Sequence, residues 1–193
     1  AHLGSSIGVA KAFHRSDLIS AIDQALSHDT RGKCLVEMAV NAREIECSVL
    51  GNDEPMASPL GEIIPGSDFY DYHAKYVSQD TKLIIPVALG VKLEQKIQQL
   101  AIKAFLAIAC QGMARVDFFL EKGTDRVFVN ELNTIPGFTS VSMYPKLWEA
   151  AGMSFAQLID RLVELAIERH ASKPSIKSAS ATPLTLGGDV TRD

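Results

Sequence analysis

The chain has 193 residues, of which 47% are hydrophobic and 22% charged, and its formal net charge is −4. This composition allows a buried core and excludes a chain that is disordered throughout. The acidic balance, with a pI near 5.7, argues against a nucleic-acid-binding protein, because such a protein needs a clustered basic face.

The cysteines and the apolar runs exclude further classes. Cys34, Cys47 and Cys110 lie far apart without C-x-x-C spacing, which indicates reduced thiols in a cytosolic protein rather than a disulfide frame or a zinc site. No apolar run approaches the roughly 18 residues of a membrane span, and the first residues do not resemble a signal peptide. The chain has no initiator Met, so we expect it to be part of something longer.

The first half of the chain predicts one helix and two strands. Apolar residues at helical spacing follow Ser16, a suitable N-cap, so a helix is expected over about 16–28. GKCLVEMAV (32–40) and EIECSVLG (44–51) are interpreted as strands separated by NAR. Residues 53–80 mix turn-forming, aromatic and charged residues and are predicted to be largely loop.

The second half predicts a hairpin between two helices. TKLIIPVAL (81–89) is strand-like up to Pro86, and an amphipathic helix is expected from Leu93 to about Cys110. ARVDFFL (114–120) and RVFVNELN (126–133) are interpreted as strands around the turn EKGTD. A strong helix pattern over 153–170 has Ser154 as its N-cap, and the Ser/Thr/Pro/Gly-rich residues 171–193 are expected to be a disordered tail.

A hairpin centred at Thr124 places two acidic side chains opposite each other. Asp117 then pairs with Glu131 and Arg115 with Asn133, all four on one face, because strand side chains alternate. Opposed like charges destabilise a strand pair, and a hard cation with oxygen ligands, Mg²⁺ or Mn²⁺, would compensate them. The other face is expected to be core, with Val116, Phe118, Leu120, Phe128 and Leu132.

The hairpin alone fits a solvated sheet face as well as it fits a metal site. The following loop, NTIPGFTSVSMYP (133–145), favours the metal site. Its Pro-Gly turn can direct backbone N–H groups towards an anion, so the two features together indicate phosphate transfer.

Several motifs, in a fixed order, resemble one protein family. They are NAREIECSVLGND (41–53), SDFYDYHAKY (67–76), GMARVDFFL (112–120) and VNELNTIPGFTSVSMYPKLWEAAG (129–152). From about Gly4 to His170 the chain is similar to the D-alanine–D-alanine ligases of the ATP-grasp superfamily. The resemblance implies an α+β ATP-grasp fold, with mixed or antiparallel sheets flanked by helices. It implies part of the central nucleotide-binding subdomain at 1–45, a C-terminal domain at 46–170 with a mobile loop at about 65–80, and a tail at 171–193.

The resemblance also implies an activity. Family members join two D-alanines into a dipeptide for peptidoglycan, using ATP, an acyl-phosphate intermediate and two Mg²⁺ or Mn²⁺ ions. A cytoplasmic protein with D-alanine as substrate, no nucleic-acid or membrane partner, and a homodimer at full length are therefore expected. The family's N-terminal domain has no counterpart here, so a C-terminal fragment, inactive alone, is expected. Alternatives are an ATP-grasp ligase joining D-alanine to a D-hydroxy acid, and a nucleotide-binding module without turnover.

Individual roles follow from the matching motifs. Asp117, Glu131 and Asn133 match the family's metal ligands. Catalytic roles are implied for Arg115, which would steady the transferring phosphate, and for Ser5 and Tyr76, loop residues of which the tyrosine favours the dipeptide product. The positions that match nucleotide contacts are Glu37, Ala39, Val40, Glu44 and Lys75. The positions that match contacts to the second D-alanine are Gly137, Ser142 and Met143.

Overall fold

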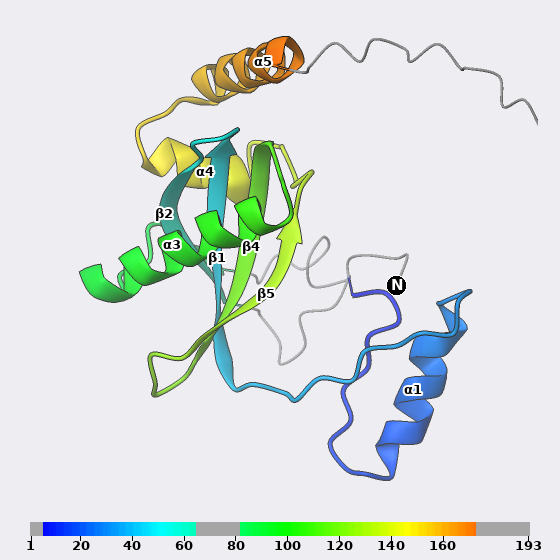
Figure 1. Ribbon diagram of the computed structural model, residues 1–193. Helices are drawn as coiled ribbons and strands as arrows, with labels where there is room; N and C mark the ends of the chain where they lie inside the picture. The colour runs from blue at the N-terminus through cyan, green and yellow to red at the C-terminus, as the bar shows by residue number, and fades with distance from the viewer. Residues whose placement is uncertain (1–5, 65–81, 173–193) are drawn as a thin grey trace, which may run out of the picture.

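The protein is described from a computed structural model that covers residues 6–64 and 82–172 (Figure 1). Five strands of these ranges form one antiparallel sheet in the order β3-β2-β1-β4-β5. The strands are β1 (Ala42–Gly51), β2 (Met56–Ile64), β3 (Lys82–Ile84), β4 (Gly112–Glu121) and β5 (Val127–Asn133). The α+β class with an antiparallel sheet is therefore confirmed.

Helices cover both faces of this sheet. They are α1 (Asp17–Ser27), α3 (Val91–Ala107), α4 (Met143–Ala150) and α5 (Phe155–Ser172). Figure 1 shows α3 across one face, α4 on the other face and α5 beyond one end of the sheet, whereas α1 lies apart from it. No residue of α1 is buried. Each helix within residues 6–64 and 82–172 is too short or too polar to span a membrane.

The alternation of β1 decides which side chains meet which helix. Cys47 and Val49 are fully buried in the cluster that includes Phe105 of α3. Ser48 points to the opposite face, where its hydroxyl donates to the Tyr144 backbone oxygen of α4 at 3.2 Å. The Tyr144 hydroxyl in turn donates to the Val49 backbone oxygen at 3.0 Å. The face that carries Ser48 is therefore the face that α4 covers.

The C-terminal helix was predicted well. α5 begins directly after Ser154, whose hydroxyl accepts the Gln157 backbone N–H at 3.3 Å. The Gln157 side chain accepts the Ser154 backbone N–H at 2.9 Å, which completes a capping box. The expected helix and N-cap are thus confirmed.

The strand predicted over residues 32–40 is wrong. Residues 32–41 belong to neither helix nor strand, and Leu35 and Met38 are 83% and 82% exposed. A strand needs a neighbour to accept and donate its backbone hydrogen bonds. Within the described ranges no other strand pairs with this segment, so its apolar pattern alone does not make it a strand.

The loop predicted over residues 53–80 contains a strand, β2. In the sequence Pro59 and Gly61 argue against a strand here, because both residue types are depleted in strands. Pro59 has no N–H to donate to β1. The register shifts at this point, and the Ser58 hydroxyl accepts the Ser48 N–H at 3.0 Å. At Gly61 a Cβ atom would lie 2.8 Å from Met143 Sδ, so the missing side chain lets α4 approach the sheet.

Gly61→Ala is expected to lower the free energy of unfolding by about 1–3 kcal/mol, because the new methyl group would overpack this contact. Urea denaturation of the variant measures the change. In a Met143→Ala background the same substitution should cost clearly less, since most of the obstructing side chain is gone. An equal cost in both backgrounds would contradict the packing explanation.

The three cysteines are free, and Cys47 is fully buried. Burial raises the pKa of the Cys47 thiol to about 12. Because the thiolate is the reactive species, native Cys47 should resist iodoacetamide at pH 8, whereas urea-unfolded protein should react at all three thiols. Peptide mass spectrometry measures the modification, with the half-exposed Cys34 as the internal control.

Candidate functional site

Two neighbouring strands bring four of the predicted residues together. In the β4–β5 register Arg115 lies opposite Asn133, and Asp117 lies opposite Glu131. This is the pairing that the sequence predicts. Arg115 also lies opposite Ser48 of β1, so the group shares the sheet face that α4 covers.

Beyond Asp117 the register shifts by one residue. Phe119 now pairs with Phe128, and Leu120 pairs with Val127. Val127 packs against the buried cluster, while Phe128 lies under the Arg126 guanidinium at 5.2 Å from the ring centre. The prediction of Phe128 as a core residue is therefore wrong, because one extra residue in β5 reverses the alternation.

Short polar contacts tie the four side chains to one another. Arg115 Nε and Nη2 donate to Asp117 Oδ1 and Oδ2, each at 2.7 Å, in a bidentate pair. Asn133 Nδ2 donates to Asp117 Oδ2 at 3.0 Å and lies 3.5 Å from Glu131 Oε1. The side chains of Arg115 and Asp117 are only 20% and 14% exposed. The group is thus ordered and partly shielded from water.

The guanidinium is a permanent charge at this site. Burial lowers the pKa of Arg115, but the hydrogen bond to Asp117 and the charges of Glu46, Asp117 and Glu131 outweigh it. The net effect raises the pKa above its ordinary value. Arg115 can therefore interact with an anionic group at any physiological pH.

A third carboxylate, Glu46, also belongs to the group and was not singled out in the sequence. It lies on β1 directly opposite Asp117, is 4% exposed, and places Oε2 3.1 Å from Arg115 Nε. Glu44, two residues earlier on the same face, lies opposite Phe119. The available signal was the pair of acids two apart in a strand whose alternate residues Ile45, Cys47 and Val49 are apolar, since acids are rarely buried without a partner.

The side chains gathered here are of the types that bind a hard divalent cation. Oxygens of Asp117 and Glu131 both lie within 3.5 Å of the Asn133 amide nitrogen, so Asn133 would have to turn its amide to offer an oxygen to a cation. Carboxylate and amide oxygens are the ligands that Mg²⁺ and Mn²⁺ prefer. Over residues 6–64 and 82–172 there is no group of three or more acidic, histidine or cysteine side chains arranged to hold a metal. Any ion here would depend on the amide and on ligands other than the acidic, histidine and cysteine side chains of the described residues.

The predicted substrate loop is held together around one hydroxyl. The Ser142 hydroxyl accepts the Thr139 backbone N–H at 3.1 Å, and a Cβ on Gly137 would lie 3.0 Å from it. Ser142 stands at the N-cap position of α4. Met143 is 5% exposed and packs in the core with Ile63 and Leu147, so a contact with substrate remains a prediction for this residue.

The predicted nucleotide residues do not all join this group. Glu37 and Ala39 are exposed and Val40 is half-buried in the segment that leads into β1. Three other predicted positions lie outside the described residues, namely Ser5, Lys75 and Tyr76. Their roles remain predictions.

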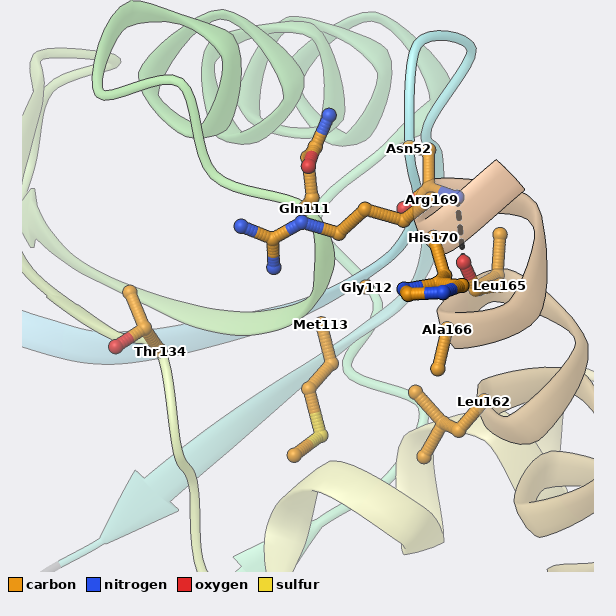
Figure 2. Close-up of a pocket in the computed structure, with 10 residues that line it drawn as sticks. All are labelled: Asn52, Gln111, Gly112, Met113, Thr134, Leu162, Leu165, Ala166, Arg169 and His170. Atoms are coloured by element: carbon orange, nitrogen blue, oxygen red, sulfur yellow. Dashed lines mark hydrogen bonds between the residues drawn. The ribbon is translucent and has the colours of Figure 1, made fainter. Parts of the chain in front are cut away.

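A separate cavity of about 470 Å³ lies at the end of the sheet beside α5 (Figure 2). It is lined by Asn52, Gln111, Gly112, Met113, Thr134, Leu162, Leu165, Ala166, Arg169 and His170. Asn52 Nδ2 donates to the Leu165 backbone oxygen at 3.0 Å, which ties the β1–β2 turn to α5. No acidic side chain lines it, so the candidate site is the carboxylate-bearing sheet face and not this cavity.

Comparisons with known sequences agree on one family. Residues 1–164 match the family model described as D-ala D-ala ligase C-terminus. The chain is 54% identical over 177 residues to a D-alanine–D-alanine ligase of Caldicellulosiruptor bescii, covering 92% of this chain and 48% of that protein. It is 51% identical over 173 residues to the ligase of Chloroherpeton thalassium, covering 90% and 47%. The chain thus spans about half the length of the curated relatives it matches.

Solved structures give the same result. The D-alanine–D-alanine ligase of Coxiella burnetii matches with a TM-score of 0.76 at 44% identity, over 88% of this chain and 44% of that one. A D-Ala:D-Ser ligase of Enterococcus faecalis matches with a TM-score of 0.74 at 39% identity, over 84% and 46%. The chain therefore belongs to the D-alanine–D-alanine ligase C-terminal family of ATP-grasp proteins.

Proposed function

We propose that this chain forms the phosphoryl-transfer part of an ATP-dependent ligase that joins two D-alanines. The observation that carries the proposal is the convergence of Arg115, Asp117, Glu131 and Asn133 on one sheet face. A fixed guanidinium beside two carboxylates suits the transfer of a phosphoryl group, where catalysis is mostly positioning and charge stabilisation.

In the proposed reaction a carboxylate oxygen of the first D-alanine attacks the γ-phosphorus of ATP, and ADP leaves. Arg115 would hold the transferring phosphoryl group, and later the oxyanion of the acyl phosphate. The amine of the second D-alanine then attacks the acyl carbon, and phosphate leaves with the former carboxylate oxygen. Asp117, Glu131 and Asn133 would hold Mg²⁺ or Mn²⁺, which neutralises phosphate charge when bound.

The loop before α4 would seat the second D-alanine. A helix N-terminus favours an anion, and Ser142 stands at that end of α4 with Gly137 beside it. The nucleotide would lie towards the start of β1, where Glu44 shares the face of the carboxylates. The other proposed contacts are Glu37, Ala39 and Val40 for the nucleotide, Met143 for the D-alanine methyl, and Ser5, Lys75 and Tyr76 for closing the site.

The proposal also covers the cellular location, the partners and the oligomeric state of the enzyme. A dipeptide of D-alanine serves peptidoglycan synthesis, so a cytoplasmic enzyme without nucleic-acid or membrane partners is proposed. A homodimer is proposed for the protein at full length. Size-exclusion chromatography with light scattering tests the dimer.

A second acceptor is a specific alternative, because one structural relative is a D-Ala:D-Ser ligase. The test is ADP release by the protein at its full natural length, with Mg²⁺-ATP and D-alanine alone or with D-serine or D-lactate. Mass spectrometry of the product separates the candidates. D-alanyl-D-alanine as the main product supports the proposal, whereas a mixed product with D-serine or D-lactate would favour the alternative. Nucleotide binding without any D-alanine-dependent ADP would reject both.

A further inference from the structure

Glu46 is a buried acid whose place in the site has no assigned role. Across three strands, Glu46, Asp117 and Glu131 lie directly opposite one another in a single row. The next row along contains Ser48, Arg115 and Asn133. The guanidinium of Arg115 reaches back from its own row to both Glu46 and Asp117.

Both acids lie beside the same nitrogen of the arginine, which donates its hydrogen bond to Asp117 and forms an ion pair with Glu46. Arg115 Nε lies 2.7 Å from Asp117 Oδ1 and 3.1 Å from Glu46 Oε2. Asp117 also accepts from Nη2 with its second oxygen, so the guanidinium is bound more tightly to Asp117 than to Glu46. In this arrangement Glu46 is the secondary partner.

The contact between Asp117 and Arg115 is weakened when Asp117 also binds a metal ion. The proposed function makes Asp117 a metal ligand, and a carboxylate that binds a cation is a weaker partner for a guanidinium. Arg115 then needs another anchor to keep its position for the phosphoryl group. Glu46 is close enough, and with 5% of its side chain exposed it is shielded from competing water.

We propose that Glu46 is a positioning residue: its carboxylate anchors the Arg115 guanidinium while Asp117 binds the metal. This inference rests on the proposed function. Gly61, the β2 partner of Glu46, has no side chain, so Met143 of α4 packs over this part of the sheet next to Glu46. Glu46 therefore lies in the part of the sheet face that α4 covers, and not at an exposed edge of the sheet.

The kinetic test compares Glu46→Gln and Glu46→Asp in the full-length protein. Glu46→Gln should lower kcat about 10–100-fold, the usual effect of losing a partner that orients a functional group. Glu46→Asp keeps the charge and should recover part of the loss. The KM for ATP and the half-saturating Mg²⁺ concentration should stay within about threefold, because the proposed role of Glu46 includes no contact with either ligand. A tenfold shift in the Mg²⁺ requirement would make Glu46 a metal ligand and overturn the proposal.

A double-mutant cycle tests the action through Arg115. In an Arg115→Lys background, Glu46→Gln should change kcat by less than about twofold, because the group it orients is already lost. The same fold-change in both backgrounds would overturn the proposal. Glu62→Gln is the matched control, since Glu62 is 7% exposed and pairs with Arg43 at 2.7 Å, but on the opposite face. It should leave kcat unchanged.

An NMR measurement tests the role of Glu46 independently of the proposed function. With ¹⁵N-arginine labelling, the Arg115 Nε–H signal is assigned by its loss in Arg115→Lys. It should be protected from exchange with water in Mg²⁺-nucleotide-bound protein and lose that protection in Glu46→Gln but not in Glu62→Gln. If D-alanine-dependent turnover is absent, only the proposed function fails, and this signal still decides whether Glu46 holds Arg115. Unchanged protection in Glu46→Gln would overturn the inference.

Discussion

Asp117→Asn should reduce D-alanine-dependent ADP release by about a thousandfold, at the upper end of what loss of one electrostatic group costs an active site. The substitution keeps the shape of the side chain but removes its charge. Arg115 then loses both charged contacts at 2.7 Å, and the Asn133 amide loses the shorter of its two carboxylate contacts. The same change removes one proposed metal ligand, so two functions of the site fail together.

The matched control for this variant is Asp125→Asn. Asp125 is exposed in the turn between β4 and β5, and the contact it makes with Lys96 uses its backbone oxygen, which the substitution leaves in place. Steady-state ADP release measures both variants, and thermal unfolding checks that both are folded. If Asp117→Asn kept a third or more of the wild-type rate, the sheet face could not be the site of phosphoryl transfer.

Phe105→Ala should lower the free energy of unfolding by about 3–5 kcal/mol, the usual cost of emptying a buried aromatic site. Phe105 is fully buried where α3 packs on Val116 and the other strand residues of the largest core cluster. A loss of this size is a large part of the stability of an ordinary domain. The site would be affected indirectly, because the alternate residues of β4 carry Arg115 and Asp117.

Leu106, the residue after Phe105 on α3, provides the control. Leu106 is 47% exposed on the same helix, so Leu106→Ala removes little buried surface and should cost less than about 1 kcal/mol. Urea denaturation with a common slope measures both variants. Similar losses for the two variants would show that α3 does not pack on the sheet through Phe105.

The sequence predicted the strand pairing of the candidate site residues better than it predicted the edges of the fold. Alternation along ARVDFFL and RVFVNELN, with a short turn between, is local information, and it correctly paired Asp117 with Glu131 and Arg115 with Asn133. The extra residue in β5 is not visible in that pattern, so the prediction that Phe128 faces the core was wrong. A register shift arises from contacts between strands, and alternation in one strand does not report it.

The other differences between prediction and structure also arise from contacts between segments that are distant in the sequence. β2 is a strand despite Pro59 and Gly61, because β1 and β3 pair with it and the Ser58 hydroxyl accepts the Ser48 N–H where the register shifts. Segment 32–41 has an apolar pattern but no neighbouring strand in the described part of the chain. Glu46 could not be placed from the sequence, because the residue with which it forms an ion pair, Arg115, lies almost seventy positions away on another strand.

The most direct test of the central claim follows an oxygen atom. Full-length protein is supplied with Mg²⁺-ATP and D-alanine whose carboxylate carries two ¹⁸O atoms, and the released phosphate is analysed by mass spectrometry. If the carboxylate attacks the γ-phosphorus and leaves with it, each phosphate will carry one ¹⁸O atom. Unlabelled phosphate, released together with the dipeptide, would contradict the acyl-phosphate route that the arrangement around Arg115 and Asp117 is proposed to serve.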